Sequence, residues 1–208
     1  WDLGDMLAFD PVTTKRNIQL GYQDAFKSYQ LLEGEAYTFY IGESRRNVLR
    51  LHRAMDHIRR RTGIDLFRQR DRLPQIQASL RHRHTGSRFI RRKDLPLTLG
   101  RAITTAGEIT GELLSLPPDD IYRFRRFNRV LLEKKSILFQ PSPAPSEPGA
   151  RRRSLGSLRR MLRLLREGCL TGKLSDAFWG VAAMAPAEFV AAVYLLAIEL
   201  HQLRKENA

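Results

Sequence analysis

The chain of 208 residues has one cysteine, Cys169, and five histidines. One cysteine cannot form a disulfide within the chain or a thiolate metal cluster, and this usage fits a reducing compartment. His82 and His84 have no acid or cysteine nearby, which is a poor ligand set for a metal. The sequence also lacks a Gly-rich phosphate loop and a nucleophile elbow. It therefore predicts no enzyme activity, no metal and no cofactor.

Acidic residues are too few to balance the basic ones: 22 Asp and Glu face 36 Lys and Arg, a formal net charge of +14. Residues 45–101 hold 17 basic and 4 acidic groups, whereas residues 1–44 hold 3 and 7. The excess is mostly arginine, whose planar guanidinium binds phosphate through two hydrogen bonds and stacks on bases. This concentration favours a nucleic acid partner. An acidic protein or a lipid surface is the alternative partner.

Two helices are predicted before the end of the first third of the chain. Apolar residues at helical spacing over 17–32 form a one-sided stripe, typical of a core or a partner-binding face. Residues 37–41 are aromatic and β-branched, which indicates a short strand or an extended arm. Ser44 is the predicted N-cap of the second helix, and Gly63 is predicted to end it.

Residues 68–92 are polar and basic, and no apolar period would hold them to a core. By themselves they are expected to be extended, and to order only against RNA. The predicted phosphate contacts in this arm are Arg81, Arg83, Arg88, Arg91 and Arg92.

Two further helices are predicted after the arm. The first covers 95–106, with Gly107 in the left-handed position past its end. The Pro117-Pro118-Asp119-Asp120 stretch predicts the start of the second, with carboxylates in its first turn. Its packed side holds Ile121, Phe124, Phe127, Leu131 and Leu138, and its cationic side holds Tyr122, Arg125, Arg126 and Arg129. No acid stands between Asp120 and Glu133, so one face of this helix is cationic throughout.

The last third begins with a proline-rich stretch, 141–149, which predicts a semi-rigid linker and a domain boundary. The helix that follows opposes leucines to arginines, and is expected to lie on RNA, on a membrane surface or on a partner protein. Residues 178–198 are apolar and about long enough to cross a bilayer, which takes ~20 residues. Gly180, Pro186 and Glu188 favour instead two packed helices, 175–184 and 186–205, buried against a neighbour.

The order of motifs over 93–141 is similar to the S-eighteen family of small-subunit ribosomal proteins. The chain has Lys93-Asp94, an apolar segment, Gly107-Glu108-Ile109, an Arg-rich helix over 122–135 and a closing Leu138-Phe139-Gln140-Pro141. The family carries a Lys-Asp, a helix, a Gly-Lys-Ile turn, an Arg-rich helix and a terminal Leu-Pro. Glu108 and Glu112 stand where the family has cations.

The resemblance implies a non-catalytic protein bound to ribosomal RNA beside a protein of the S-six family. It implies a small core of Leu99, Ile103, Ile109, Leu114, Leu116 and Leu131. It implies RNA contacts by Lys93, Arg101, Arg123, Arg125, Arg126 and Arg129. Lys134 and Lys135, at the end of the Arg-rich helix, complete the predicted RNA-binding set. The long extensions, and a start at Trp1 that is expected of a processed or incompletely covered N-terminus, suit a mitochondrial protein.

The predicted fold is mostly α, a small helical RNA-binding domain with an extended basic arm and helical N- and C-terminal extensions. The predicted segments are an N-terminal extension at 1–67, the arm at 68–92, the S-eighteen-like domain at 93–141, a Pro/Arg-rich linker at 142–153 and a C-terminal extension at 154–208.

The predicted function is a structural constituent of the mitochondrial small ribosomal subunit, in the matrix, in contact with ribosomal RNA and neighbouring small-subunit proteins. One alternative is an accessory subunit of a mitochondrial inner-membrane respiratory complex. Leu116-Pro117 followed by Arg126 and Arg129 is similar to a small subunit of the cytochrome bc complex, and residues 178–198 would then contact membrane protein or lipid. The second alternative is a free RNA- or DNA-binding factor.

Overall fold

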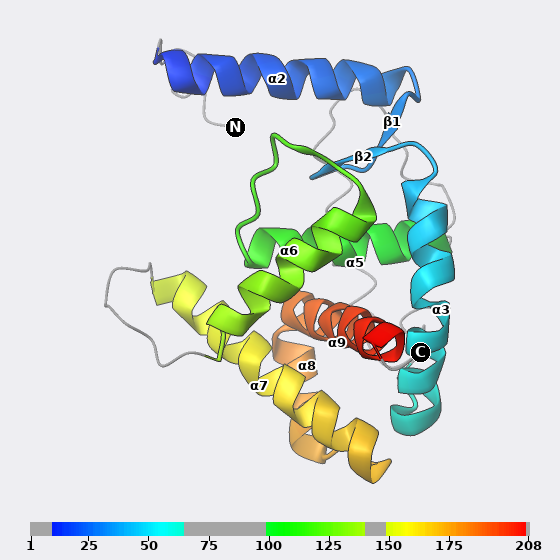
Figure 1. Ribbon diagram of the computed structural model, residues 1–208. Coiled ribbons are helices and arrows are strands. Elements are labelled where there is room, and N and C mark those ends of the chain that lie inside the picture. The colour runs from blue at the N-terminus through cyan, green and yellow to red at the C-terminus, as the bar shows by residue number, and fades with distance from the viewer. Residues whose placement is uncertain (1–9, 65–98, 140–148, 207–208) are drawn as a thin grey trace.

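The computed structural model describes residues 10–64, 99–139 and 149–206. In these ranges the chain is mostly α, as predicted, with seven helices and three short strands (Figure 1). The helices are α2 Pro11–Ser28, α3 Glu43–Thr62, α5 Leu99–Leu113, α6 Phe124–Ile137, α7 Gly149–Thr171, α8 Asp176–Met184 and α9 Pro186–Glu206. The strands are β1 Leu32–Glu33, β2 Thr38–Tyr40 and β3 Ile121–Tyr122. The predicted arm and residues 142–148 of the predicted linker lie outside the described residues. Residues 149–153 of that linker are instead the first residues of α7.

The last helix, α9, is the centre of the fold and packs against α3, α5, α6 and α7 (Figure 1). Its side chains from Phe189 to Ile198 are all buried. The prediction of two packed helices in this apolar region is confirmed, because α8 ends at Met184 and α9 begins at Pro186. Proline suits the first helical position, where its missing N–H would have no partner in the helix.

No single helix in the described ranges is both long enough and apolar enough to cross a bilayer. The pair α8 and α9 passes that test together by length and composition, with a bend of 118° between the two helices. The apolar centre of α9 is covered by the chain's own helices, so the prediction that this region is buried against a neighbour is wrong for these residues.

The described helices other than α2 share one hydrophobic core, which runs from Tyr37 on the N-terminal side to Ile198 in α9. The core that the resemblance implied is buried at Ile103, Ile109, Leu114, Leu116 and Leu131, and the side chain of Leu99 is outside the described part. The five predicted segments stay a prediction. What the structure adds is that helices from the N-terminal, middle and C-terminal parts pack on one another.

A three-stranded sheet joins the N-terminal part to α6. β1 pairs with β2 in antiparallel fashion, and β2 pairs with β3 in parallel, so that Phe39 lies beside Tyr122. The predicted helix start at residues 117–120 is wrong, because β3 follows these residues and α6 begins only at Phe124. Side chains alternate along a strand. Tyr122 is therefore buried and Ile121 exposed, the reverse of the prediction.

The predicted end of the first middle helix is also wrong, since α5 continues through Gly107 to Leu113. A Cβ atom at Gly107 would lie 3.0 Å from the hydroxyl oxygen of Tyr194. Glycine at this position therefore lets α9 approach α5, and it does not serve as a stop signal. The left-handed residue after the helix is Ser115, with a φ of 51°.

Helix α3 begins one residue earlier than its predicted cap. The N-cap is Gly42 in the left-handed conformation, and the N–H of Ser44 donates to the side chain of Glu33. At the other end Gly63, with a φ of 73°, terminates the helix as predicted.

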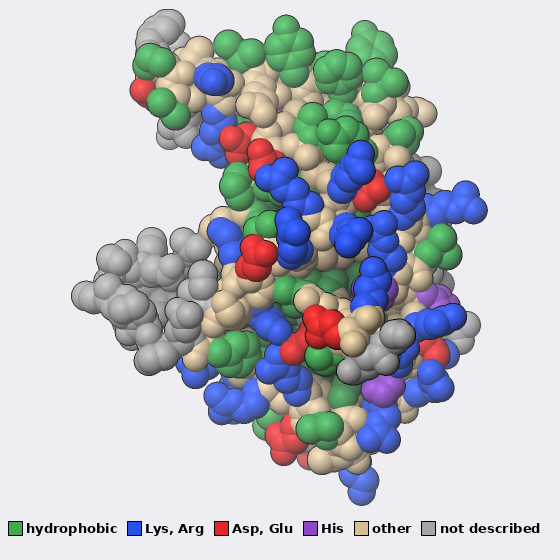
Figure 2. Space-filling model, viewed as in Figure 1, with side chains coloured by type: hydrophobic (Ala, Val, Ile, Leu, Met, Phe, Trp, Pro, Cys, Tyr) green, Lys and Arg blue, Asp and Glu red, His purple; other side chains and the backbone are tan. Residues whose placement is uncertain are grey.

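Helix α2 lies along one edge of the molecule, above β1 and β2 in Figure 1. Its polar face is turned inward, where the Gln19 and Gln23 side chains both donate to the backbone oxygen of Asp119. Its apolar face is exposed along the outer edge in Figure 2 and comprises Ile18, Tyr22, Phe26 and Tyr29. The predicted stripe is therefore a surface and not part of the core.

Candidate nucleic-acid interface

Helix α6 carries the cationic face that the sequence predicts. Phe124, Phe127 and Leu131 are fully buried, and Arg125, Arg126 and Arg129 are exposed. Residues three and four apart share a helix face, so the apolar spacing fixes both sides at once. The core therefore determines which way the three guanidinium groups point.

An aromatic cluster holds the inner face of α6 against β2. The Phe39 and Phe124 rings stack with centroids 4.0 Å apart, and Phe127 meets Phe39 edge-on at 5.2 Å. Tyr37 and Tyr122 pack edge-on against the same Phe127 ring. Such pairs add about 0.5–1.5 kcal/mol each beyond their buried area. The side of α6 opposite its exposed arginines is therefore tightly packed.

The N-terminus of α6 is capped from another helix. Its N-cap residue, Arg123, has no side-chain cap bond. Instead, Glu43 at the start of α3 accepts the N–H of Phe124 at 2.9 Å through Oε2, and its Oε1 accepts from Arg46, also at 2.9 Å. This buried carboxylate fixes α6 relative to α3 and is not free to repel an anion at the surface.

The exposed arginines of α6 are largely unneutralised. Within the described part of the chain, neither Arg125 nor Arg126 has a carboxylate at ion-pair distance. Arg129 lies 3.7 Å from Glu133 one turn on, and both side chains are exposed. Such a surface pair contributes only about 0.3–0.5 kcal/mol, so Arg129 can exchange it for a phosphate.

Two lysines of the predicted RNA-binding set bind groups of the protein itself. Lys134 Nζ donates to the backbone oxygens of Leu114 and Ser115, where α5 ends. Lys135 Nζ lies 3.1 Å from Glu199 of α9, whose carboxylate also accepts two hydrogen bonds from Arg166. These lysines join α6 to its neighbours, and the structure places them apart from the exposed arginines.

The remaining predicted contacts are described only in part. Arg123 is exposed at the start of α6. Arg101 belongs to α5, but its side chain is outside the described part. Arg81, Arg83, Arg88, Arg91, Arg92 and Lys93 also lie outside the described residues.

Helix α3 extends the cationic surface beyond the residues that were predicted. Figure 2 shows Lys and Arg side chains gathered over α3 and α6. Arg45 and Arg53 are exposed, whereas Arg59 and Arg60 share Asp56. The hydrogen bond from Arg59 holds the pKa of the Asp56 carboxyl below its usual value.

Cationic groups also meet where α3 packs against the end of α9. Arg50 Nη1 is buried and has no hydrogen-bond partner in the described part of the chain. Burial lowers the pKa of His201, and the charges of Lys205, Arg50 and Arg204 lower it further. These groups repel one another, and a bound polyanion would relieve that repulsion.

Helix α7 presents a second arginine face. Its buried side consists of Leu158, Met161, Leu162 and Leu165, and its exposed arginines are Arg153, Arg159, Arg160 and Arg163. The predicted opposition of leucine and arginine is confirmed at these positions, whereas the predicted Arg166 is half-buried and pairs with Glu199 of α9. Arg159 also lies over the Phe139 ring, 5.8 Å from the centroid.

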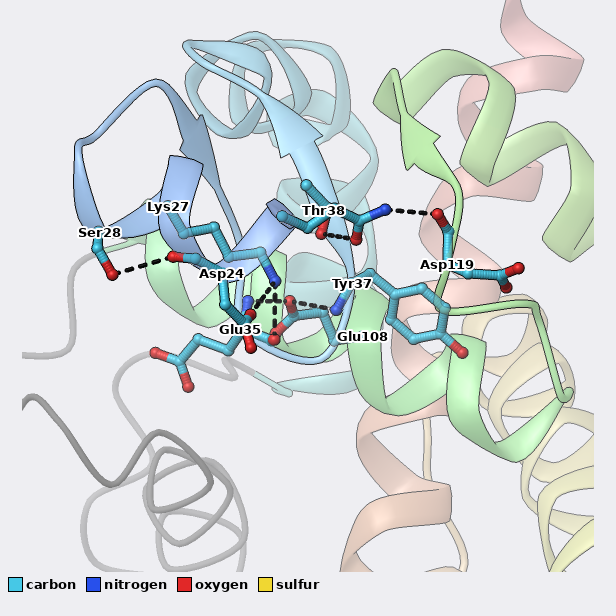
Figure 3. Close-up of polar contacts among 9 residues, drawn as sticks. Asp24, Lys27, Ser28, Glu35, Tyr37, Thr38, Glu108 and Asp119 are labelled. Atoms are coloured by element: carbon cyan, nitrogen blue, oxygen red, sulfur yellow. Dashed lines mark hydrogen bonds and ion pairs between the residues drawn. The ribbon is translucent and has the colours of Figure 1, made fainter. Parts of the chain in front are cut away.

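Glu108, which stands where the resembled family has a cation, is fully inside the protein. Its Oε1 accepts the backbone N–H groups of Glu35 at 2.6 Å and Tyr37 at 3.3 Å (Figure 3). Lys27 of α2 donates to the backbone oxygen of Glu35 in the same cluster. Burial raises the pKa of Glu108 to about 7, although the two N–H groups and Lys27 act against this shift. The residue anchors the β1–β2 connection and cannot touch RNA.

The site thus consists of exposed arginine on α3, α6 and α7. In the described ranges, no group of three or more His, Cys, Asp or Glu side chains is placed to hold a metal ion. Comparison with models of protein families, with curated proteins and with solved structures finds no match for the chain. The resemblance to the S-eighteen family therefore rests on the quoted motifs alone.

Proposed function

We propose that the protein is a non-catalytic, RNA-bound subunit of a ribonucleoprotein particle, and that this particle is the mitochondrial small ribosomal subunit. The observation that carries the proposal is the face of α6. Arg125, Arg126 and Arg129 are exposed together on a helix whose opposite side is locked into the core.

Arginine is the reason for preferring RNA to an acidic protein. A guanidinium keeps its charge, matches the geometry of a phosphate and is weakly hydrated, so it binds polyanions better than an ammonium group does. All of the exposed cations named on α3, α6 and α7 are arginines. Each phosphate contact releases condensed counterions, so the affinity should fall steeply with salt.

The ribosomal assignment and the matrix location rest on the motifs over 93–141, which are similar to those of the S-eighteen family. On this proposal the partners are ribosomal RNA and neighbouring small-subunit proteins, including an S-six-type protein. The exposed apolar face of α2 is suited to a protein neighbour.

The alternative, an accessory subunit of an inner-membrane complex, relied on an apolar C-terminal region in contact with lipid or membrane protein. The burial of Phe189 to Ile198 inside the core removes much of the surface that such contacts would use. Carbonate extraction separates the two proposals, because a ribosomal subunit leaves the membrane fraction with its RNA.

The test is charge reversal on α6. The variant carries Arg125→Glu, Arg126→Glu and Arg129→Glu, and is expected to lose cosedimentation with small ribosomal subunits. A control reverses charge at exposed sites elsewhere, with Arg16→Glu and Lys173→Glu. The control is expected to sediment with the particle until nuclease is added. Normal assembly of the α6 variant would refute the proposed RNA face.

A further inference from the structure

Next to the arginines of α6, the outer face of the small sheet holds an aromatic ring beside a guanidinium. The parallel register pairs Thr38 with Ile121 and Phe39 with Tyr122, so Tyr40 and Arg123 follow side by side. The Arg123 guanidinium carbon lies 5.7 Å from the centroid of the Tyr40 ring. Tyr40 and Arg123 are exposed, whereas Phe39 and Tyr122 enter the core. Thr38, on the same side of β2 as Tyr40, is buried and bonded to Gln23 of α2.

The pair is open to solvent, and exposed arginines follow Tyr40 closely in the chain. Tyr40 is 47% exposed, and Arg123 is also exposed. Arg45 and Arg46, on the first turn of α3, follow Tyr40 closely in the chain and are exposed as well. Of the nearby acids, Glu43 caps α6 and pairs with Arg46, and Glu33 accepts the N–H of Ser44. Asp119 and Asp120 precede Arg123 by four and three residues.

We infer that Tyr40 and Arg123 form a stacking platform for an unpaired nucleobase, so that the RNA on this face is single-stranded at this point. This inference rests on the proposed function and specifies the form of its RNA. A base within a duplex already stacks on its neighbours, whereas an unpaired base can stack on an aromatic ring or on a guanidinium plane. The arginines of α6 then hold the flanking phosphates.

The geometry fits a base better than it fits a structural role. A Tyr–Arg contact at an exposed site contributes only about 0.5–1 kcal/mol to folding. Neither side chain is needed to fill the core, which Phe39 and Tyr122 complete from the other side of the strands. Stacking of one base on an aromatic ring is worth about 1–3 kcal/mol, which corresponds to roughly 5- to 150-fold in affinity.

The test measures the affinity of the full chain for a fluorescent oligouridine and for an RNA duplex of the same length, at one salt concentration. Tyr40→Ala is expected to weaken oligouridine binding by roughly 5-fold or more and to change duplex binding less than twofold. Tyr40→Phe, which keeps the ring, is expected to bind as the wild type does. Tyr22→Ala, which removes an exposed ring from α2, is the matched control and is expected to change neither affinity.

Arg123→Lys keeps the charge and loses the plane, so it is expected to weaken oligouridine binding more than duplex binding. Circular dichroism and the Tm check that each variant is folded. Equal losses for both RNA forms in Tyr40→Ala, or no loss for either, would overturn the stacking platform. If the stacking platform failed in this way but charge reversal at Arg125, Arg126 and Arg129 still abolished RNA binding, the proposed function would stand and only the platform would be rejected. If the wild type bound neither RNA, both proposals would fail.

Discussion

Glu43 on α3 accepts the N–H of Phe124 on α6 through a 2.9 Å hydrogen bond, although 81 residues separate the two in the chain. The carboxylate lies at the helix N-terminus, where the helix dipole favours negative charge. It replaces the side-chain cap that Arg123 does not supply. This buried contact fixes the N-terminus of α6 to α3, while the packed inner face of α6 determines which way its arginines point.

Glu43→Ala is expected to lower the free energy of unfolding by about 1–3 kcal/mol, because it leaves the buried N–H of Phe124 without an acceptor. Glu43→Gln keeps an acceptor oxygen and should lose less. Urea denaturation measures both. Glu133→Ala, at an exposed site on α6, is the control and should stay within about 0.5 kcal/mol of the wild type. An equal effect of Glu43→Ala and Glu133→Ala would contradict the cap.

The buried carboxyl of Glu108 makes stability depend on pH. Its pKa is about 7 in the folded protein and 4.5 as the ordinary value, so the folded chain holds the proton more tightly. The contribution of Glu108 to the free energy of unfolding should be greatest below the ordinary pKa and fall as pH rises from 4.5 to 7, by up to about 3 kcal/mol.

Glu108→Gln removes this titration. The difference in unfolding free energy between wild type and variant should therefore shift against the wild type as pH rises between 4.5 and 7. Urea midpoints measured at several pH values in that interval give the difference directly. A constant difference across the interval would show that Glu108 keeps one protonation state there.

Gly111 and Gly21 form a matched pair of helical glycines. A Cβ atom at Gly111 would lie 2.9 Å from Phe127 and from the Tyr37 ring, whereas one at Gly21 would meet nothing within 4 Å. Gly111→Ala should lower stability by about 1–3 kcal/mol through overpacking. Gly21→Ala should raise it by up to about 1 kcal/mol through helix propensity. Changes of the same sign in the two thermal melts would contradict the close packing of α5, α6 and β2.

The two faces of α6 and α7 were predictable because a helix repeats every 3.6 residues, so leucine and phenylalanine at three- and four-residue spacing define both sides. The break at Pro186 was predictable for a local reason as well. The end of α5 was not predictable from the local sequence. Gly107 has the local signature of a stop, and its actual role depends on Tyr194, which lies far away in the sequence.

The start of α6 was mispredicted for a similar reason. Residues 117–120 have good capping chemistry, but pairing with β2 draws Ile121 and Tyr122 into a strand. The Tyr40 and Arg123 pair depends on this same register, so no motif near either residue could reveal it. The local apolar spacing predicted the arginine face of α6. The pairing of β2 with β3, which are far apart in the sequence, brings the Tyr40 ring beside Arg123.

The most direct test of the central claim is the nucleic acid content of the native assembly. The protein is purified in its complex, irradiated with ultraviolet light and digested, and the peptides that carry ribonucleotides are identified. The account predicts ribonucleotide-bearing peptides from the region of Tyr40 and from α6. A native complex that contains the protein and no RNA would contradict it.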